Sequence, residues 1–340
     1  MRKLIVAAVT VAFVLLGLAV PVVAAADGVD SDAKVVIIVG ADTPQYLDDA
    51  NELYAEAVQH TSNVIRVYSP NATWSAVYEA TTGANVVIYL GHGNGWPSPY
   101  TYDPNYTTKD GFGLNSSAAG THSNLKYYGE PSIRSLKLAP GAIVFLHHLC
   151  YASGNSEPGQ AQPSQSTARQ RVDNYGAAFL AAGASAVIAD GHSHTGYYLR
   201  ALFTQTESLV DLWRGAPNYH GHEIMFVPSR STGTGIMDPD NGGGSPSNFY
   251  RSIVGDLSFM TSAVIGVKLP PGVRGDPGSV VVPDRIPGQD LGTAPDDVSA
   301  TWSEPVTVSR EAAGFLAGPR PLQLARSSFL EGRPLSAPRR

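Results

Sequence analysis

The apolar positions of this chain follow two patterns that take turns along the sequence. Short β-branched runs with no polar alternation predict strands that are buried on both faces of a sheet. These runs cover residues 34–40, 63–69, 85–91, 142–148 and 184–190. Between them, apolar residues recur at helical spacing and predict amphipathic helices. The predicted helices cover residues 44–58, a segment capped by Asn71 or Thr73 that ends near Ala80, and residues 166–183 and 197–216.

Strands that alternate with helices predict an α/β fold, a three-layer sandwich with a mainly parallel sheet covered on both faces. Further along, residues 222–228 read as a strand, and residues 248–266 as a helix or as a helix and a strand. Residues 92–141 are rich in Gly, Asn, Ser, Tyr and Pro. They predict a long loop, and a loop of that length in a compact domain usually carries function.

Both ends of the chain differ from this pattern. Residues 1–26 combine Arg2 and Lys3 with an apolar run and a small-residue stretch ending at Ala26, which is typical of a secretory signal peptide. An uncleaved membrane anchor is the alternative interpretation. Residues 27–268 form the predicted α/β domain, and residues 269–340, dense in Pro and Gly, predict a mostly disordered tail. We therefore expect a secreted protein that is not embedded in a membrane.

The composition is typical of a globular domain and raises the question of what its single cysteine does. The 340 residues are 43% hydrophobic and 15% charged, with a net charge of −6, which suits a globular domain and argues against a nucleic-acid partner. The chain has a single cysteine, Cys150. In an exported chain an unpaired cysteine is either an intermolecular partner or a free thiol.

Polar side chains collect where three predicted strands end. The strand 85–91 is followed by His92, the strand 142–148 by Cys150, and the strand 184–190 ends at Asp190. The carboxyl ends of neighbouring parallel strands lie at one edge of a sheet, where catalytic groups gather. An imidazole that meets a thiol there can take its proton and return it to a leaving group.

These motifs resemble those of a known family. The sequence "GHG" after one strand, "HHLCYASG" at the end of the next, and the helix-glycine-strand segment "AAFLAAGASAVIAD" resemble the caspase-like (clan CD) cysteine peptidases, in organisation most like gingipain and CHAT-type members. The resemblance implies that His92 is the catalytic base and Cys150 the nucleophile. It places the oxyanion hole at the amides of Gly93 and Cys150. It also implies a peptide or protein substrate and no cofactor.

Other residues could support or line such a site. Strand alternation would put His148 on the same face as Cys150, and would point His147 away together with Leu149. Asp190 could line a pocket for a basic side chain. An aromatic loop that begins at Trp96 and includes three tyrosines could grip a peptide or a sugar. The tyrosines are Tyr100, Tyr102 and Tyr106.

Two alternatives remain open. Leu149 and Tyr151 flank the cysteine with large side chains, which motivates a non-catalytic extracellular binding module of the same fold. The stretch "DGHSH" could instead hold a transition metal. Its candidate ligands are Asp190, His192 and His194. Calcium is a further candidate at two acidic loops. Those loops contain Asp103, Asn105 and Asp110, and Asp238, Asp240 and Asn241.

Overall fold

The computed structural model describes residues 31–191, 195–241 and 248–266. The predicted signal peptide, residues 1–26, and the predicted tail, residues 269–340, lie outside the described residues, as do His192 and His194. All described residues belong to one compact unit.

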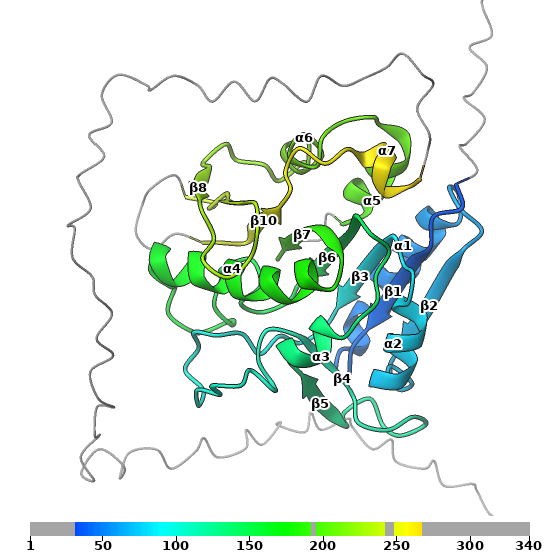
Figure 1. Ribbon diagram of the computed structural model, residues 1–340. Helices are drawn as coiled ribbons and strands as arrows, with labels where there is room; N and C mark the ends of the chain where they lie inside the picture. Colours follow the sequence, from blue (N-terminus) through cyan, green and yellow to red (C-terminus); the bar gives the residue numbers. More distant parts are fainter. Residues whose placement is uncertain (1–30, 192–194, 242–247, 267–340) are drawn as a thin grey trace, which may run out of the picture. The chain divides into compact units, whose positions relative to one another are not determined.

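An eight-stranded sheet forms the centre of the domain, in the order β2-β1-β3-β6-β7-β10-β9-β8 (Figure 1). The first five strands in that order are parallel, and β10, β9 and β8 add an antiparallel extension. The strands are β1 (Val35–Val39), β2 (Val64–Tyr68), β3 (Val86–Leu90), β6 (Ala142–His147), β7 (Ala184–Asp190), β8 (Ile224–Phe226), β9 (Thr234–Met237) and β10 (Arg251–Gly255). The predicted mainly parallel sheet is confirmed.

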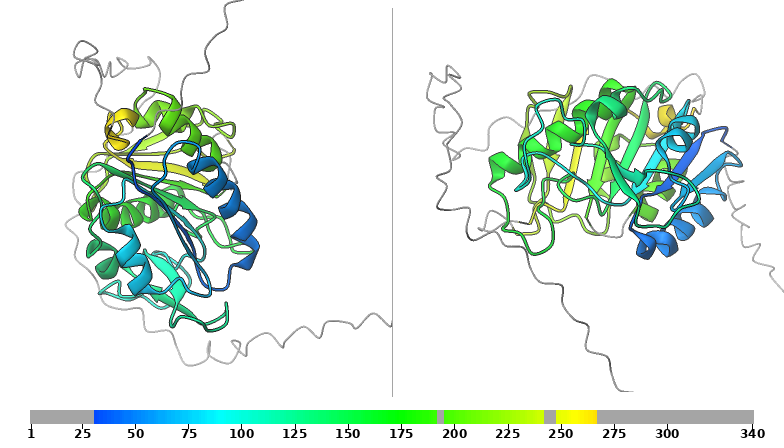
Figure 2. Two further views of the ribbon diagram at one scale, coloured as in Figure 1. Left: turned by 90° about the vertical axis from the view of Figure 1, so that its right-hand side faces the viewer. Right: turned by 90° about the horizontal axis from the view of Figure 1, so that it is seen from below.

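Helices cover both faces of the sheet, so the predicted three-layer α/β fold is confirmed (Figure 2). One face carries α2 (Trp74–Thr81), α3 (Glu130–Arg134) and α4 (Gln165–Ala181). The opposite face carries the short 3-10 helix η1 (Pro44–Tyr46), α1 (Leu47–Ala57), α5 (Thr195–Thr204), α6 (Leu209–Arg214) and α7 (Thr261–Val264). Among the described helices, none is long and apolar enough to cross a membrane.

Two separate apolar cores follow from this layering. In β6, Val144 and Leu146 pack toward α4, whereas Ile143 and Phe145 pack toward α1 and α5. Successive side chains of a strand point to opposite faces, so a strand covered on both sides needs apolar residues at every position. This requirement explains the uninterrupted β-branched runs of the sequence.

The long loop predicted over residues 92–141 holds more structure than expected. It contains the antiparallel pair β4 (Phe112–Asn115) and β5 (Leu125–Tyr128), followed by α3. The buried hydroxyl of Tyr89 ties β4 to the end of β3, because it accepts the Gly113 N–H and donates to the Gly113 carbonyl, both at 2.9 Å.

Three other expectations need correction at the C-terminal side of the domain. The segment 248–266 contains β10 and then α7, so the strand precedes the helix. The helix predicted over residues 197–216 is divided, because Ser208 caps a new helix by accepting the Asp211 N–H at 3.2 Å. Strand β9 had no counterpart in the prediction.

Candidate functional site

The loops that follow β3 and β6 carry His92 and Cys150, and these two strands are neighbours. They pair in parallel register, with Leu90 opposite His147 at their carboxyl ends. His92 and Cys150 therefore emerge two and three residues beyond matched positions at one edge of the sheet. This is the edge at which parallel α/β sheets place ligands and reacting groups.

Gly93 packs directly on the backbone of Cys150. A Cβ added to Gly93 would overlap the Cys150 carbonyl oxygen and would lie 2.8 Å from the Tyr175 hydroxyl. That hydroxyl also donates to the Cys150 carbonyl at 3.3 Å. Only glycine fits here, because no side chain can occupy the space between the two loops. The close approach brings the peptide that follows His92 against the residue that carries the thiol.

The segment that carries Cys150 is a strained turn. His148 and Tyr151 have positive φ angles of 55° and 72°. Non-glycine residues in this region cost on the order of 1–3 kcal/mol each and gather at functional sites. Hydrogen bonds hold the turn at both ends. The His148 N–H donates to the Asp190 carbonyl at 2.9 Å, and the Tyr151 N–H donates to Asn155 Oδ1 at 2.8 Å.

Strand β6 ends at His147, so the alternation of side chains between the two faces of the sheet does not continue beyond that residue. The faces predicted for the residues after His147 therefore need correction. His147 faces α1 and α5, as alternation requires. Leu149 does not join it, because the turn places Leu149 in the opposite core with Tyr151. Both flanking side chains are at most 2% exposed, whereas Cys150 is only partly buried. The two large neighbours thus fill the core and leave the thiol at its margin.

The surroundings of the thiol favour its protonated form. Burial, together with the smaller effect of the Glu157 carboxylate, raises the pKa of Cys150 to about 11. Among the described residues, no imidazole contributes to this pKa. The resting site thus holds a neutral thiol, which has to lose its proton during an attack on a substrate.

This state has a measurable consequence in the pH dependence of thiol alkylation. Since only the thiolate reacts, the rate of iodoacetamide modification is expected to rise about tenfold per pH unit from pH 7 to 10. In urea the same thiol is expected to titrate near its ordinary pKa of about 8.5. Cys150 is the sole cysteine, so intact mass reports on it alone. A rate that reaches its plateau below pH 9 in the folded protein would contradict a raised pKa.

Asp190 lies in an ion-pair network under the site. Its side chain is 3% exposed and accepts hydrogen bonds from Tyr198 and Asn218, at 3.1 and 3.2 Å. Arg251, which is fully buried, lies 3.8 Å from it and also pairs with Asp238 at 2.8 Å. Tyr198, Asn218 and Arg251 thus already engage the Asp190 carboxylate, so the suggestion that Asp190 lines a pocket for a basic side chain gains no support.

The aromatic loop after Gly93 is anchored to α4 and to the segment after Cys150. The backbone N–H of Trp96 donates to Asp110 Oδ1 at 3.0 Å, and its backbone carbonyl accepts from Asn174 Nδ2 at 2.7 Å. Its ring packs on Tyr102 with centroids 4.7 Å apart. Tyr100 is 52% exposed and donates to Glu157 at 2.7 Å, which places an aromatic ring and a carboxylate beside the thiol.

The acidic residues of the two suggested calcium loops have other roles. Asp103 organises its own turn by accepting from Asn105, Thr107 and Thr108. Asp110 is buried, and burial raises its pKa to about 8, so this carboxyl is largely neutral near pH 7. These contacts give no support to a calcium site at residues 103–110. Asp238 is paired with the buried Arg251.

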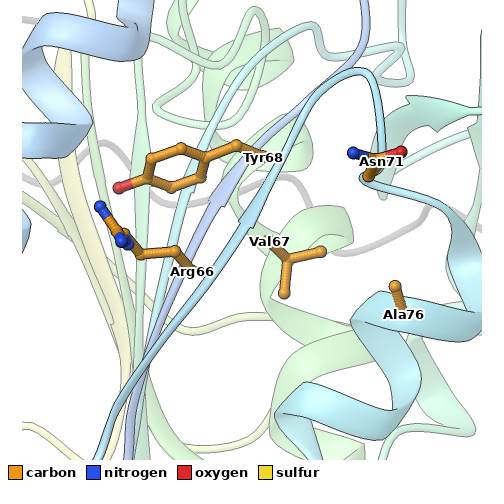
Figure 3. Close-up of a pocket in the computed structure, with 5 residues that line it drawn as sticks. All are labelled: Arg66, Val67, Tyr68, Asn71 and Ala76. Carbon is orange, nitrogen blue, oxygen red and sulfur yellow. The ribbon is translucent and has the colours of Figure 1, made fainter. Parts of the chain in front are cut away.

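Two hollows of the surface do not have Cys150 in their lining. One, of about 430 Å³, is at the outer strand β2, where Arg66 and Tyr68 point to one side of the strand and Val67 points toward Ala76 (Figure 3). The other, of about 310 Å³, lies between α1 and α5, with Asp49, His147 and Thr195 in its lining. Asp49 was not among the predicted site residues, because a helix surface carboxylate has no local signature of function.

Comparison with known proteins adds one structural likeness. No protein-family model matches the chain, and no curated protein matches it in sequence. Among solved structures, the chain is similar to a secreted C11 cysteine protease from Bacteroides thetaiotaomicron that was determined in complex with an irreversible peptide inhibitor. The identity is 10% and the TM-score 0.31, over 61% of this chain and 66% of that one, just under two thirds of its length. The chemistry assigned below therefore rests on the geometry of this chain.

Proposed function

We propose that this chain is a secreted cysteine peptidase in which Cys150 attacks the scissile carbonyl and His92 handles the proton. The observation that carries the proposal is the packing of Gly93 on the Cys150 carbonyl at the ends of two adjacent parallel strands. That contact supports a thiol and an imidazole at one edge of the sheet. The signal-like residues 1–26 support export of the protein.

In the proposed reaction, the Cys150 sulfur forms a bond to the carbonyl carbon while its proton passes to His92. The developing negative charge on oxygen is stabilised by the amides of Gly93 and Cys150. When the intermediate collapses, the C–N bond breaks and the imidazolium returns the proton to the leaving amine. Water then hydrolyses the thioester and releases the thiol. Because the thiol is neutral at rest, its proton has to pass to His92 as the attack occurs.

The exposed tyrosines support a peptide as substrate. Tyr100 and Tyr102 are 52% and 48% exposed on the loop that follows the catalytic histidine. Aromatic rings at a surface offer a large contact area with little loss of side-chain entropy. Trp96, whose ring packs on Tyr102 and whose backbone is anchored to Asp110 and Asn174, would hold these tyrosines in place for a peptide.

The role of His92 can be tested with a matched histidine control. A substrate peptide is first selected from a library by cleavage with the wild-type protein. With that substrate, His92→Gln is expected to lower kcat/KM by about 10²–10⁴-fold, the usual range for a lost acid-base group. His122→Gln is the control, because the His122 ring interacts with Ser69 and no feature of the site uses it. Equal rates for wild type and His92→Gln would contradict the role of His92.

A non-catalytic binding module is the second candidate. The high pKa of Cys150 favours it, since a thiol held near pKa 11 and beside Glu157 is a poor nucleophile unless a base removes its proton. In that case the wild type would cleave no peptide of the library, and the exposed tyrosines would serve to hold a ligand.

A further inference from the structure

A second group of reactive side chains lies on the α1 side of the sheet. Asp49 of α1, His147 at the end of β6 and His148 each present one ligand atom, and these three atoms lie within 4.8 Å of one another. None of the three has a role in the peptidase chemistry proposed above. Figure 2 shows α1 on the face of the sheet opposite to α4, so the group is separate from the core beneath Cys150.

His147 is the central residue of the group, and one of its ring nitrogens is unsatisfied. The side chain is 3% exposed. Its Nδ1 interacts with the Thr195 hydroxyl at 2.5 Å. Its Nε2 is buried, has no hydrogen-bond partner and lies 3.6 Å from Asp49 Oδ2. Buried polar atoms without partners are rare in native proteins, and a bound water or ion is one explanation for them.

The pairing of Nε2 with a carboxylate oxygen needs either a hydrogen on Nε2, with Nδ1 accepting from the Thr195 hydroxyl, or a cation between the two atoms. If Nδ1 donates to Thr195, the lone pair of Nε2 points toward Asp49, and two acceptors face each other. Such an arrangement is repulsive until a proton or a metal ion occupies the space. A contact from Nδ1 to a fixed hydroxyl is also the kind of support that orients a metal-bound histidine.

Several contacts hold His148 beside this pair, among them a hydrogen bond of its ring to the Gly191 backbone. Its ring stands nearly perpendicular to that of His147, with centroids 4.3 Å apart, and stacks on Tyr46 at 5.2 Å. The backbone N–H of His148 donates to the Asp190 carbonyl at 2.9 Å. The backbone of His148 has the left-handed conformation described above. The ring is thus positioned by backbone geometry and stacking, as the second imidazole of a metal site needs to be.

We propose that Asp49, His147 and His148 bind a divalent transition-metal ion of the Zn²⁺ type. Two imidazoles and one carboxylate are ligands that such ions prefer. Zn–N and Zn–O bonds of roughly 2.0–2.1 Å in a tetrahedral site separate the ligand atoms by about 3.4 Å. The 3.6 Å between Nε2 and Oδ2 is close to that value. The ligand atom of His148 lies within 4.8 Å of the other two, so a tetrahedral site requires it to move closer to them.

The neighbouring cavity suits an open coordination position. The hollow of about 310 Å³ is lined by Asp49, His147 and Thr195, together with Glu52 and Glu56. A site with three protein ligands keeps a fourth position for water or another ligand. This set differs from the one suggested by "DGHSH", because Asp190 is paired with Arg251. It also adjoins the Cys150 turn, since His148 belongs to that turn and stacks on Tyr46.

The test uses the full chain, stripped of metal with a chelator and titrated with CoCl₂ and then ZnCl₂ at pH 7.5. One equivalent of Co²⁺ is expected to give visible d–d absorption bands that Zn²⁺ abolishes, and calorimetry is expected to give a 1:1 stoichiometry. Asp49→Asn and His147→Gln are each expected to weaken binding at least tenfold. Asp49 is 38% exposed, so its variant is expected to stay folded.

Two control variants separate this site from adventitious binding. Glu52→Gln changes the same cavity without removing a ligand, and His220→Gln alters a second histidine, 3.7 Å from Asp240. Both are expected to bind as the wild type does. Binding that is unchanged in Asp49→Asn, or no stoichiometric binding by the wild type, would overturn the proposal and leave a proton as the occupant. The readout needs no peptidase activity, so its outcome is independent of the function proposed above.

Discussion

Replacing Cys150 with alanine is expected to abolish peptide hydrolysis, with kcat falling at least 10³-fold. The variant has no nucleophile, and the remaining amides of the site can only orient water. Its fold is expected to persist, because Cys150 lies at the margin of the core and the substitution removes a single sulfur atom. Circular dichroism and the melting temperature check the fold, and a fluorogenic peptide checks the rate.

Cys150→Ser is the matched companion of this variant. It keeps the shape of the side chain and replaces the thiol with a hydroxyl of much higher pKa, so it is also expected to be inactive. Hydrolysis at wild-type rates by the alanine variant would show that another residue performs the attack.

Gly93→Ala is expected to have the second-largest effect, because it forces the His92 and Cys150 loops apart. The new Cβ would overlap the Cys150 carbonyl oxygen and press on Tyr175. Overpacking of this kind costs about 1–3 kcal/mol of stability. Displacement of an oxyanion donor lowers kcat by about 10²–10³-fold. Urea unfolding and peptide kinetics measure the two effects.

Gly196→Ala is the control for that substitution. Nothing lies within 4 Å of a Cβ at Gly196, and the residue sits within α5. Alanine is expected to be neutral or slightly stabilising there, since it is the better helix former. Equal activity of the Gly93 and Gly196 variants would contradict the close packing of the two loops.

The strand framework could be predicted from the sequence because a sheet covered on both faces demands unbroken apolar runs. Strands β1, β3 and β6 have that pattern, and the ends of β3 and β6 locate His92 and Cys150 at one edge. The outer strand β2 departs from it at the exposed Arg66. Strand β9, with the sequence Thr-Gly-Ile-Met, is too short and too weakly patterned to be recognised. The β4–β5 pair was missed for a related reason, since its position depends on a buried contact from Tyr89.

The side-chain details of the site depended on features that local sequence does not reveal. The positive φ angles of His148 and Tyr151 end the alternation of β6, so Leu149 left the face predicted for it. The burial of Leu149 and Tyr151 explains how two large residues can flank a partly exposed thiol. Asp49 meets His147 only because α1 packs across the end of β6, which is a tertiary contact.

Covalent labelling of the wild-type protein by a peptidyl chloromethyl ketone or acyloxymethyl ketone asks whether Cys150 is a catalytic nucleophile. At pH 7.5 we expect one adduct per chain, mapped to Cys150 by peptide mass spectrometry, that forms faster than iodoacetamide labelling and is blocked by a competing peptide substrate. His92→Gln is expected to slow this labelling strongly. Labelling no faster than that of a simple thiol at pKa 11, with no protection by peptides, would contradict a peptidase and favour a binding module.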